Sequence, residues 1–274
     1  MPTPEIMKKR DADATLLFAI EIIRNEFKSL AIVLLYIAGP VILFSGLVNY
    51  FYFDEVFGAF FQDSANPDAL QIFTPHYFLL VLSQALLITV IFMVTIFYIR
   101  EKYTQGHSPS PAHLWFEILN HIGLYYGYAL LLGILLFVSF MAFFIPGIWL
   151  LVASSLFFPV LIFEGHGFGD TLARSFYLIK DNWWRTLGLL LFSFFILYII
   201  NMIIQMLIVL VTTPLGLTAF TEDKSLSAGL LIAFSQLTQL LHAFIAVVLS
   251  VHYFSLKARK DPRFPQSFFP PSHK

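Results

Sequence analysis

The sequence predicts an all-α integral membrane protein with six transmembrane helices. The chain has 274 residues, of which 58% are hydrophobic and only 12% are charged, whereas soluble domains carry about 25% charged residues. Six apolar segments approach the roughly 20 residues that a bilayer crossing requires, and none of them contains Asp, Glu, Lys or Arg. All Lys and Arg residues except Lys224 fall on one side of the resulting layout. We therefore expect lipid to solvate much of this chain.

The predicted spans follow one another along a single membrane domain, residues 1–256. They cover residues 30–53, 77–99, 124–144, 148–163, 187–211 and 226–249. Helix is the predicted form because isolated strands cannot satisfy their backbone hydrogen bonds in lipid. The fourth span is short and follows the turn pair Pro146-Gly147, so the third and fourth spans are predicted to form a tight helical hairpin. The tail, residues 257–274, is polar and proline-rich and is expected to be flexible.

Lys and Arg residues set the predicted orientation. They gather before the first span, in the second and fourth loops, and after the sixth span. Cytoplasmic loops hold the excess of Lys and Arg, so we predict a multi-pass protein of the cell (inner) membrane with both termini in the cytoplasm. Asp11 and Asp13 directly follow the basic residues 8–10. This order differs from that of a cleavable signal peptide, and we expect the first span to remain as an anchor.

A short amphipathic helix is predicted before each odd-numbered span. Apolar residues recur there at spacings of three and four, which marks one helix face: Leu16, Ile20, Ile23 and Phe27; Trp115, Ile118 and Ile122; Leu172, Phe176, Ile179 and Trp183. The expected helix starts are Asp13, Ser110-Pro111 and Asp170, residue types suited to N-caps and first turns. The chain is thus predicted to contain three repeats of interfacial amphipathic helix plus helical hairpin. The alternative, that juxtamembrane segments are often amphipathic without repetition, stays open.

Part of the chain resembles a known family. Between Phe144 and Gly188 it carries, in order, Pro146-Gly147-Ile148-Trp149, Phe158-Pro159-Val160, Glu164, Ala173-Arg174-Ser175, Leu178 and Trp183-Trp184-Arg185. This stretch resembles uncharacterised bacterial six-span membrane proteins related to the membrane domain of glycerophosphodiester phosphodiesterases. The resemblance implies a multi-pass membrane protein. It does not imply phosphodiesterase activity, because that chemistry belongs to a separate soluble barrel of about 250 residues, for which this chain has no room.

One candidate site is a basic and aromatic belt before the fifth span. It consists of Arg174, Lys180, Trp183, Trp184 and Arg185. The functional interpretation is binding of anionic lipid headgroups. The simpler interpretation, which the sequence favours, is ordinary topology-setting and interfacial anchoring.

A second candidate site lies inside the predicted spans. Asn201 and Gln205 are one turn apart in the fifth span, and Gln236, Gln239 and His242 recur at every third residue in the sixth. These residues could line a polar path or binding site, because polar groups are costly in lipid and commonly functional. The alternative is hydrogen bonding between helices. The sequence favours the alternative because no span carries a carboxylate.

The motifs of known enzymes are missing from the sequence, and no catalytic residue is assigned. Cysteine is absent, which removes thiolate chemistry and cysteine-based metal sites. Glu164, His166 and Asp170 share one loop, but an N-cap role for Asp170 is preferred to a metal site there. We therefore expect no metal and no cofactor. The net charge is −1, and the sequence lacks the clustered basic surface that is typical of nucleic-acid-binding proteins.

These observations favour a non-enzymatic membrane protein that acts as a scaffold or accessory subunit. The expected partners are membrane lipids and other membrane proteins, and the sequence does not fix an oligomeric state. The alternative is a transporter or channel for a small or lipidic solute, with the polar residues of the fifth and sixth spans lining its route.

Overall fold

The structure is a computed structural model that describes residues 5–62, 74–106, 109–212, 232 and 235–261. Every regular element in these residues is a helix. Six of the helical segments are long and apolar enough to cross a membrane. The predicted fold class, an all-α multi-pass membrane protein, is therefore confirmed.

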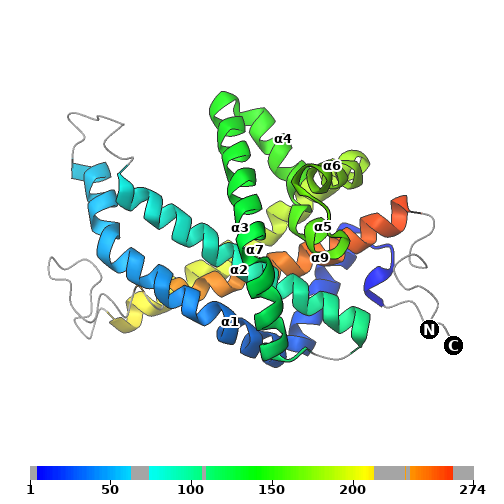
Figure 1. Cartoon of the computed structure of the whole chain (residues 1–274), viewed down its shortest axis with the longest axis horizontal. Coiled ribbons are helices and arrows are strands. Elements are labelled where there is room, and N and C mark those ends of the chain that lie inside the picture. Colours follow the sequence, from blue (N-terminus) through cyan, green and yellow to red (C-terminus); the bar gives the residue numbers. More distant parts are fainter. Residues whose placement is uncertain (1–4, 63–73, 107–108, 213–231, 233–234, 262–274) are drawn as a thin grey trace.

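Four long helices form a bundle along the longest axis of the molecule (Figure 1). They are α1 (Ala12–Gln62), α2 (Pro75–Gln105), α7 (Trp183–Thr212) and α9 (His242–Lys260). Helix α9 contacts each of the other three, and all its residues from Ile245 to Lys257 are buried. Its place at the centre explains why a helix of modest hydropathy lies in a membrane protein: protein rather than lipid surrounds it.

Four further helices form a layer that crosses this bundle. They are α3 (Pro111–Ala142), α4 (Phe144–Ser154), α5 (Phe157–Glu164) and α6 (Phe168–Ile179). Figure 1 shows α3 crossing the bundle at a steep angle, with α4 returning beside it toward α6. The buried residues of α3 are only Leu114, Ile118, Tyr125 and Leu132. The exposed residues of this helix from Leu124 onward are apolar, which suits contact with acyl chains.

The predicted hairpin of the third and fourth spans is present, but its turn lies three residues earlier than Pro146. Phe143 is extended, with φ −159° and ψ 133°, and separates α3 from α4. Pro146 instead lies in the first turn of α4, where a missing N–H breaks no helical hydrogen bond. Gly147 permits the close packing, because a Cβ there would lie 2.5 Å from the Phe140 ring.

The fourth predicted span is broken into two helices. Pro159 has no N–H to bond the Ser155 carbonyl, and its ring crowds that carbonyl; α4 accordingly ends at Ser154 and α5 starts at Phe157. Pro159 is the third residue of α5, so the break lies just before it. Helix α6 then folds back along the pair, and Ser175 Oγ donates to the Ala153 carbonyl at 2.7 Å.

The start of the fourth span lies in a different place from the one predicted. In the predicted layout Trp149 and Trp183 would lie near opposite membrane surfaces, about 30 Å apart. In the structure the Trp183 indole Nε1 donates to the Trp149 carbonyl at 3.4 Å. The start of α4 and the start of α7 therefore lie at the same level of the molecule.

The amphipathic segments differ among themselves. The first two are continuous with the following spans in α1 and α3, and only the third, α6, is a separate helix. Three equivalent repeats therefore stay a prediction. Ser110 caps α3 as expected, since its Oγ accepts from the His113 N–H at 3.2 Å. The N-cap prediction for Asp170 is wrong: α6 starts at Phe168 after Gly167, and Asp170 lies in its first turn, where a negative charge favours the helix dipole.

The predicted tail also starts later than expected. Helix α9 continues to Lys260, so residues 257–260 are helical, and the Lys257 side chain is buried. Residues 262–274, for which flexibility was predicted, lie outside the described residues.

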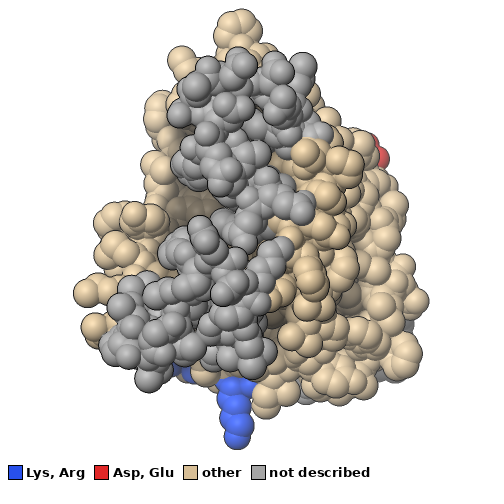
Figure 2. All heavy atoms as spheres, turned by 90° about the vertical axis from the view of Figure 1, so that its left-hand side faces the viewer, with Lys and Arg blue, Asp and Glu red and all other residues tan. Residues whose placement is uncertain are grey.

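Charge is distributed unevenly along the bundle. Near the start of α1, Asp11 forms ion pairs with Arg185 of α7 at 3.4 Å and Arg259 of α9 at 3.0 Å. Figure 2 shows the opposite end, where the described residues are almost all uncharged. This asymmetry agrees with the predicted orientation, which stays a prediction.

Candidate functional site

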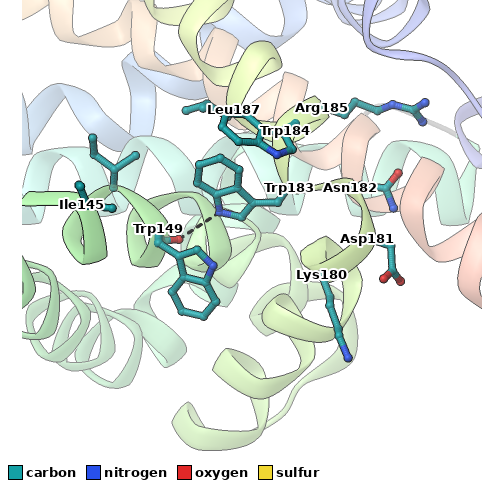
Figure 3. A pocket seen from close by; sticks show the side chains of 10 residues that line it. Ile145, Trp149, Lys180, Asp181, Asn182, Trp183, Trp184, Arg185 and Leu187 are labelled. Atoms are coloured by element: carbon teal, nitrogen blue, oxygen red, sulfur yellow. Dashed lines mark hydrogen bonds between the residues drawn. The ribbon is translucent and has the colours of Figure 1, made fainter.

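A large cleft lies where α4 meets the junction of α6 and α7. Its volume is about 870 Å³, and its lining comes from two segments: Ile145, Ile148 and Trp149 of α4, and Lys180, Asp181, Asn182, Trp183, Trp184, Arg185 and Leu187. Figure 3 shows the indoles of Trp149 and Trp183 at the centre of this lining, with Lys180 and Asp181 toward one side. Four of the five belt residues predicted from the sequence thus line one cleft.

Local backbone geometry presents these side chains. Helix α6 ends at Ile179, a single 3-10 turn covers Lys180–Asn182, and α7 starts at Trp183. The tighter turn changes the direction of the chain, so residues 180–185 project around the junction rather than along one helix face. The Trp183–Trp149 hydrogen bond then fixes the junction against α4. Trp149 also packs edge-on against Phe176 of α6, with ring centroids 5.5 Å apart.

A second, smaller hollow adjoins the cleft. It has a volume of about 340 Å³ and is lined by Trp149, Ala153, Phe176, Tyr177, Ile179, Lys180 and Trp183. Trp149, Lys180 and Trp183 therefore line both hollows. The two indoles and the aliphatic part of Lys180 form one amphipathic surface, with an ammonium group at its polar end.

The charged residues of the belt have different surroundings. Lys180 has no ion-pair partner among the described residues, whereas the neighbouring Asp181 pairs with Lys260 at 2.9 Å. Arg185 reaches Asp11, and its Nη1 is buried without a hydrogen bond in the described part of the chain. Figure 3 shows the Arg185 guanidinium directed away from the indoles. Lys180 is thus the cation best placed to meet an anion at the cleft.

Arg174 does not line the cleft. Its guanidinium binds both oxygens of Glu164, with Nε–Oε2 3.0 Å and Nη2–Oε1 3.4 Å. The same carboxylate accepts from Lys257 Nζ at 2.8 Å and Tyr253 Oη at 2.7 Å. This set, which we call the Glu164 network, joins α5, α6 and α9. Sequence reasoning missed it because Lys257 lay in the predicted tail.

In the loop considered for a metal, two of the three candidate side chains lie together. His166 Nε2 lies 3.3 Å from Glu164 Oε2, but Asp170 does not belong to any group of converging ligands among the described residues. Arg174, Lys257 and Tyr253 already occupy the Glu164 oxygens.

Two of the polar residues predicted inside the spans, Gln236 and Asn201, form hydrogen bonds to other helical segments. Gln236 is buried, and its Oε1 accepts from Ser45 Oγ of α1 at 3.3 Å and from Gln84 Nε2 of α2 at 3.2 Å. Asn201 Nδ2 of α7 donates to Thr238 Oγ1 at 3.3 Å. These bonds support the bridging interpretation of Gln236 and Asn201.

The remaining polar residues of the spans behave differently. His242 Nδ1 lies 2.9 Å from the Gln239 carbonyl, a contact within the same short segment. Gln205, Gln239 and His242 are all partly exposed. Sequence reasoning missed Ser45, Gln84 and Thr238 as the partners of Gln236 and Asn201.

Sequence reasoning also missed the α4 wall of the cleft. Ile145 and Trp149 follow the hairpin turn, and the predicted layout separated them from Lys180 by a full membrane thickness. The signal was present in the tryptophan itself, because Trp residues are enriched at membrane interfaces.

Comparisons with protein-family models, curated proteins and solved structures find no match for this chain.

Proposed function

We propose that this chain is a non-enzymatic membrane protein that holds a phospholipid in the cleft between α4 and the start of α7, and that it acts as a scaffold or accessory subunit in the cell membrane. The observation that carries the proposal is the joint lining of the cleft by indoles and a lysine ammonium group. The relation to the membrane domains of glycerophosphodiester phosphodiesterases remains part of this proposal.

The walls of the cleft suit an acyl chain. Ile145, Ile148 and Leu187 supply aliphatic surface, and Trp149 and Trp183 supply broad aromatic faces. A volume of about 870 Å³ falls within the range of about 300–1,000 Å³ that is common for small-molecule sites. It accommodates the upper part of a lipid rather than a whole molecule, so the rest of each chain would continue into the bilayer.

The polar end of the cleft suits a phosphate. The Lys180 ammonium group is the cation of the belt that has no carboxylate partner among the described residues. Tryptophan N–H groups and lysine side chains commonly lie at headgroup level. A single lysine near an anionic surface contributes about 1 kcal/mol. We therefore expect a preference for anionic over zwitterionic lipid of about fivefold from Lys180.

The experiment is a lipid titration of the purified protein, followed by native mass spectrometry. Phosphatidylglycerol and phosphatidylcholine of matched acyl chains are added to protein in detergent, and the bound fraction is measured. Lys180→Gln should remove most of the preference for phosphatidylglycerol, and Trp183→Ala should weaken the binding of both lipids. Lys28→Gln is the matched control, because Lys28 is exposed on α1 and does not line the cleft. Equal binding by the wild type, Lys180→Gln and Trp183→Ala would contradict the proposal.

Transport is the less favoured alternative. It requires a polar route through the bundle, for which the sequence offered Asn201, Gln205, Gln236, Gln239 and His242. Two of these, Asn201 and Gln236, have side-chain hydrogen-bond partners on other segments, which is the arrangement expected of polar residues that stabilise helix packing in membranes.

A further inference from the structure

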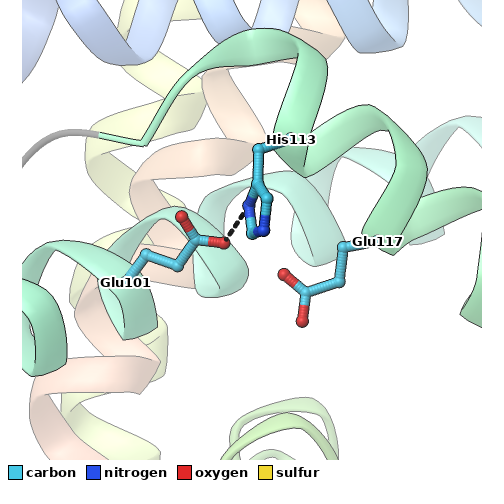
Figure 4. Close-up of side chains that lie close together, drawn as sticks. All are labelled: Glu101, His113 and Glu117. Carbon is cyan, nitrogen blue, oxygen red and sulfur yellow. Dashed lines mark ion pairs between the residues drawn. The ribbon is translucent and has the colours of Figure 1, made fainter.

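A second group of side chains lies apart from the cleft, where α2 ends and α3 begins. It consists of Glu101 near the end of α2 and of His113 and Glu117 near the start of α3. His113 and Glu117 are four residues apart and therefore lie on one helix face. Figure 4 shows the three side chains converging on a common space. One ligand atom from each residue lies within 4.8 Å of the others.

Glu101 is the most unusual member of this group. The residue is only 3% exposed, yet no donor in the described part of the chain reaches its Oε1 with hydrogen-bond geometry. His113 Nδ1 lies 3.0 Å from this oxygen and pairs with it when the imidazole is protonated. A buried carboxylate oxygen without a hydrogen bond is unfavourable, and a bound cation would remove that cost.

Glu117 shows the same feature. One of its oxygens pairs with Arg100, while the other, Oε2, is buried without a hydrogen bond among the described residues. Arg100 thus neutralises one of the two carboxylates. An acceptor oxygen from each carboxylate and a ring nitrogen from His113 are left facing one another.

We propose that Glu101, His113 and Glu117 bind a divalent first-row transition-metal ion that cross-links α2 to α3. Carboxylate and imidazole ligands suit Zn²⁺ and Mn²⁺. With bonds of about 2.1 Å, adjacent ligand atoms lie about 3.0 Å apart and opposite ones about 4.2 Å apart. The 3.0 Å between His113 Nδ1 and Glu101 Oε1 matches an adjacent pair of ligand atoms. The ligand atoms of the three residues all lie within 4.8 Å of one another, so a small side-chain rotation would bring them to these distances.

The partial exposure of the site fits a bound ion. The His113 side chain is 62% exposed, so an ion and its remaining water ligands can enter from solvent. Three protein ligands leave positions open for water. The ion would hold the base of α3 against α2 next to the connection between them, independently of the lipid cleft.

The test measures metal binding directly. Protein in detergent is stripped with EDTA, loaded with Zn²⁺ or Mn²⁺, and analysed by elemental mass spectrometry after removal of free metal. The wild type should retain one ion per chain. His113→Ala should raise the dissociation constant by at least about tenfold, and Glu101→Gln should have a similar effect. His113 is largely exposed, so its replacement should leave the elution profile in size-exclusion chromatography unchanged.

His166→Ala is the matched control. His166 is also a partly exposed histidine beside a buried glutamate, Glu164, at 3.3 Å, but that carboxylate is occupied by other donors. This variant should bind metal as the wild type does. The proposal is overturned if the wild type retains no ion at micromolar metal, if His113→Ala binds as tightly as the wild type, or if both histidine variants lose the ion equally. The first result would indicate that a proton neutralises Glu101, the second that the ion binds without His113, and the third adventitious surface binding.

Discussion

Removing Glu164 should destabilise the protein more than removing any one of its partners. The carboxylate and Lys257 are each only 9% exposed, and the ion pair is 2.8 Å long. At an effective dielectric constant of about 20, the attraction at this distance is about 6 kcal/mol, most of which offsets the cost of removing both charges from water. Breaking such a buried pair from one side costs about 3–5 kcal/mol.

The structure ranks the variants within that range. Glu164→Gln removes the carboxylate charge that Lys257, Arg174 and Tyr253 all bind, so we expect a loss near the upper end, about 5 kcal/mol. Lys257→Met leaves Arg174 and Tyr253 on the carboxylate, so the loss should be near 3 kcal/mol. The double variant should be less destabilised than the sum of the singles by up to about 3 kcal/mol, because the two residues interact directly.

The assay is reversible unfolding in mixed micelles by titration with SDS, followed by tryptophan fluorescence, which gives differences in the free energy of unfolding. Glu5→Gln is the matched control, since Glu5 and Lys8 form an ion pair at 3.3 Å with side chains 67% and 61% exposed. That variant should lose less than about 1 kcal/mol. If Glu164→Gln costs no more than Glu5→Gln, or if the double variant is simply additive, the Glu164 network does not hold α9 to α5.

Two further predictions concern helix packing and use the same assay. Gln236→Leu should lower the free energy of unfolding by about 1 kcal/mol, because it removes two hydrogen bonds to neighbouring helices worth about 0.6 kcal/mol each. An unchanged free energy of unfolding would contradict the bridging role of Gln236 and favour the transport alternative. Gly147→Ala should cost about 1–3 kcal/mol by overpacking against the Phe140 ring, whereas Gly133→Ala, with open space around its Cβ position, should be neutral or slightly stabilising. Equal effects of the two glycine substitutions would contradict the close approach of α4 to α3.

The fold class could be predicted from the sequence because its cause is local. Six charge-free apolar segments can be solvated only by lipid or by one another, and the order of residues alone reveals them. The start of α3 was predictable for the same reason, since Ser110 caps the helix with its own side chain. Four belt residues were found because basic and aromatic side chains are adjacent in the sequence there.

The features that the sequence did not reveal depend on which helices meet. Nothing near Lys257 in the sequence indicates that a glutamate on α5 lies 2.8 Å away, so residues 257–260 were assigned to a flexible tail. Trp149 was placed far from Trp183 because apolar composition does not distinguish a helix that crosses the bundle from one that runs along it. Glu101 was overlooked because its burial comes from packing against other helices rather than from its neighbours in sequence.

The most direct test of the lipid proposal is intact-complex mass spectrometry of the protein gently purified from its native membranes. We predict a protein that carries one phospholipid per chain, with the lipid lost or exchanged in Lys180→Gln and retained in Lys28→Gln. A chain that carries no lipid, or one whose bound lipid is the same in both variants, would contradict the proposed cleft site. A partner protein bound in fixed ratio would support the scaffold role and identify what the scaffold serves.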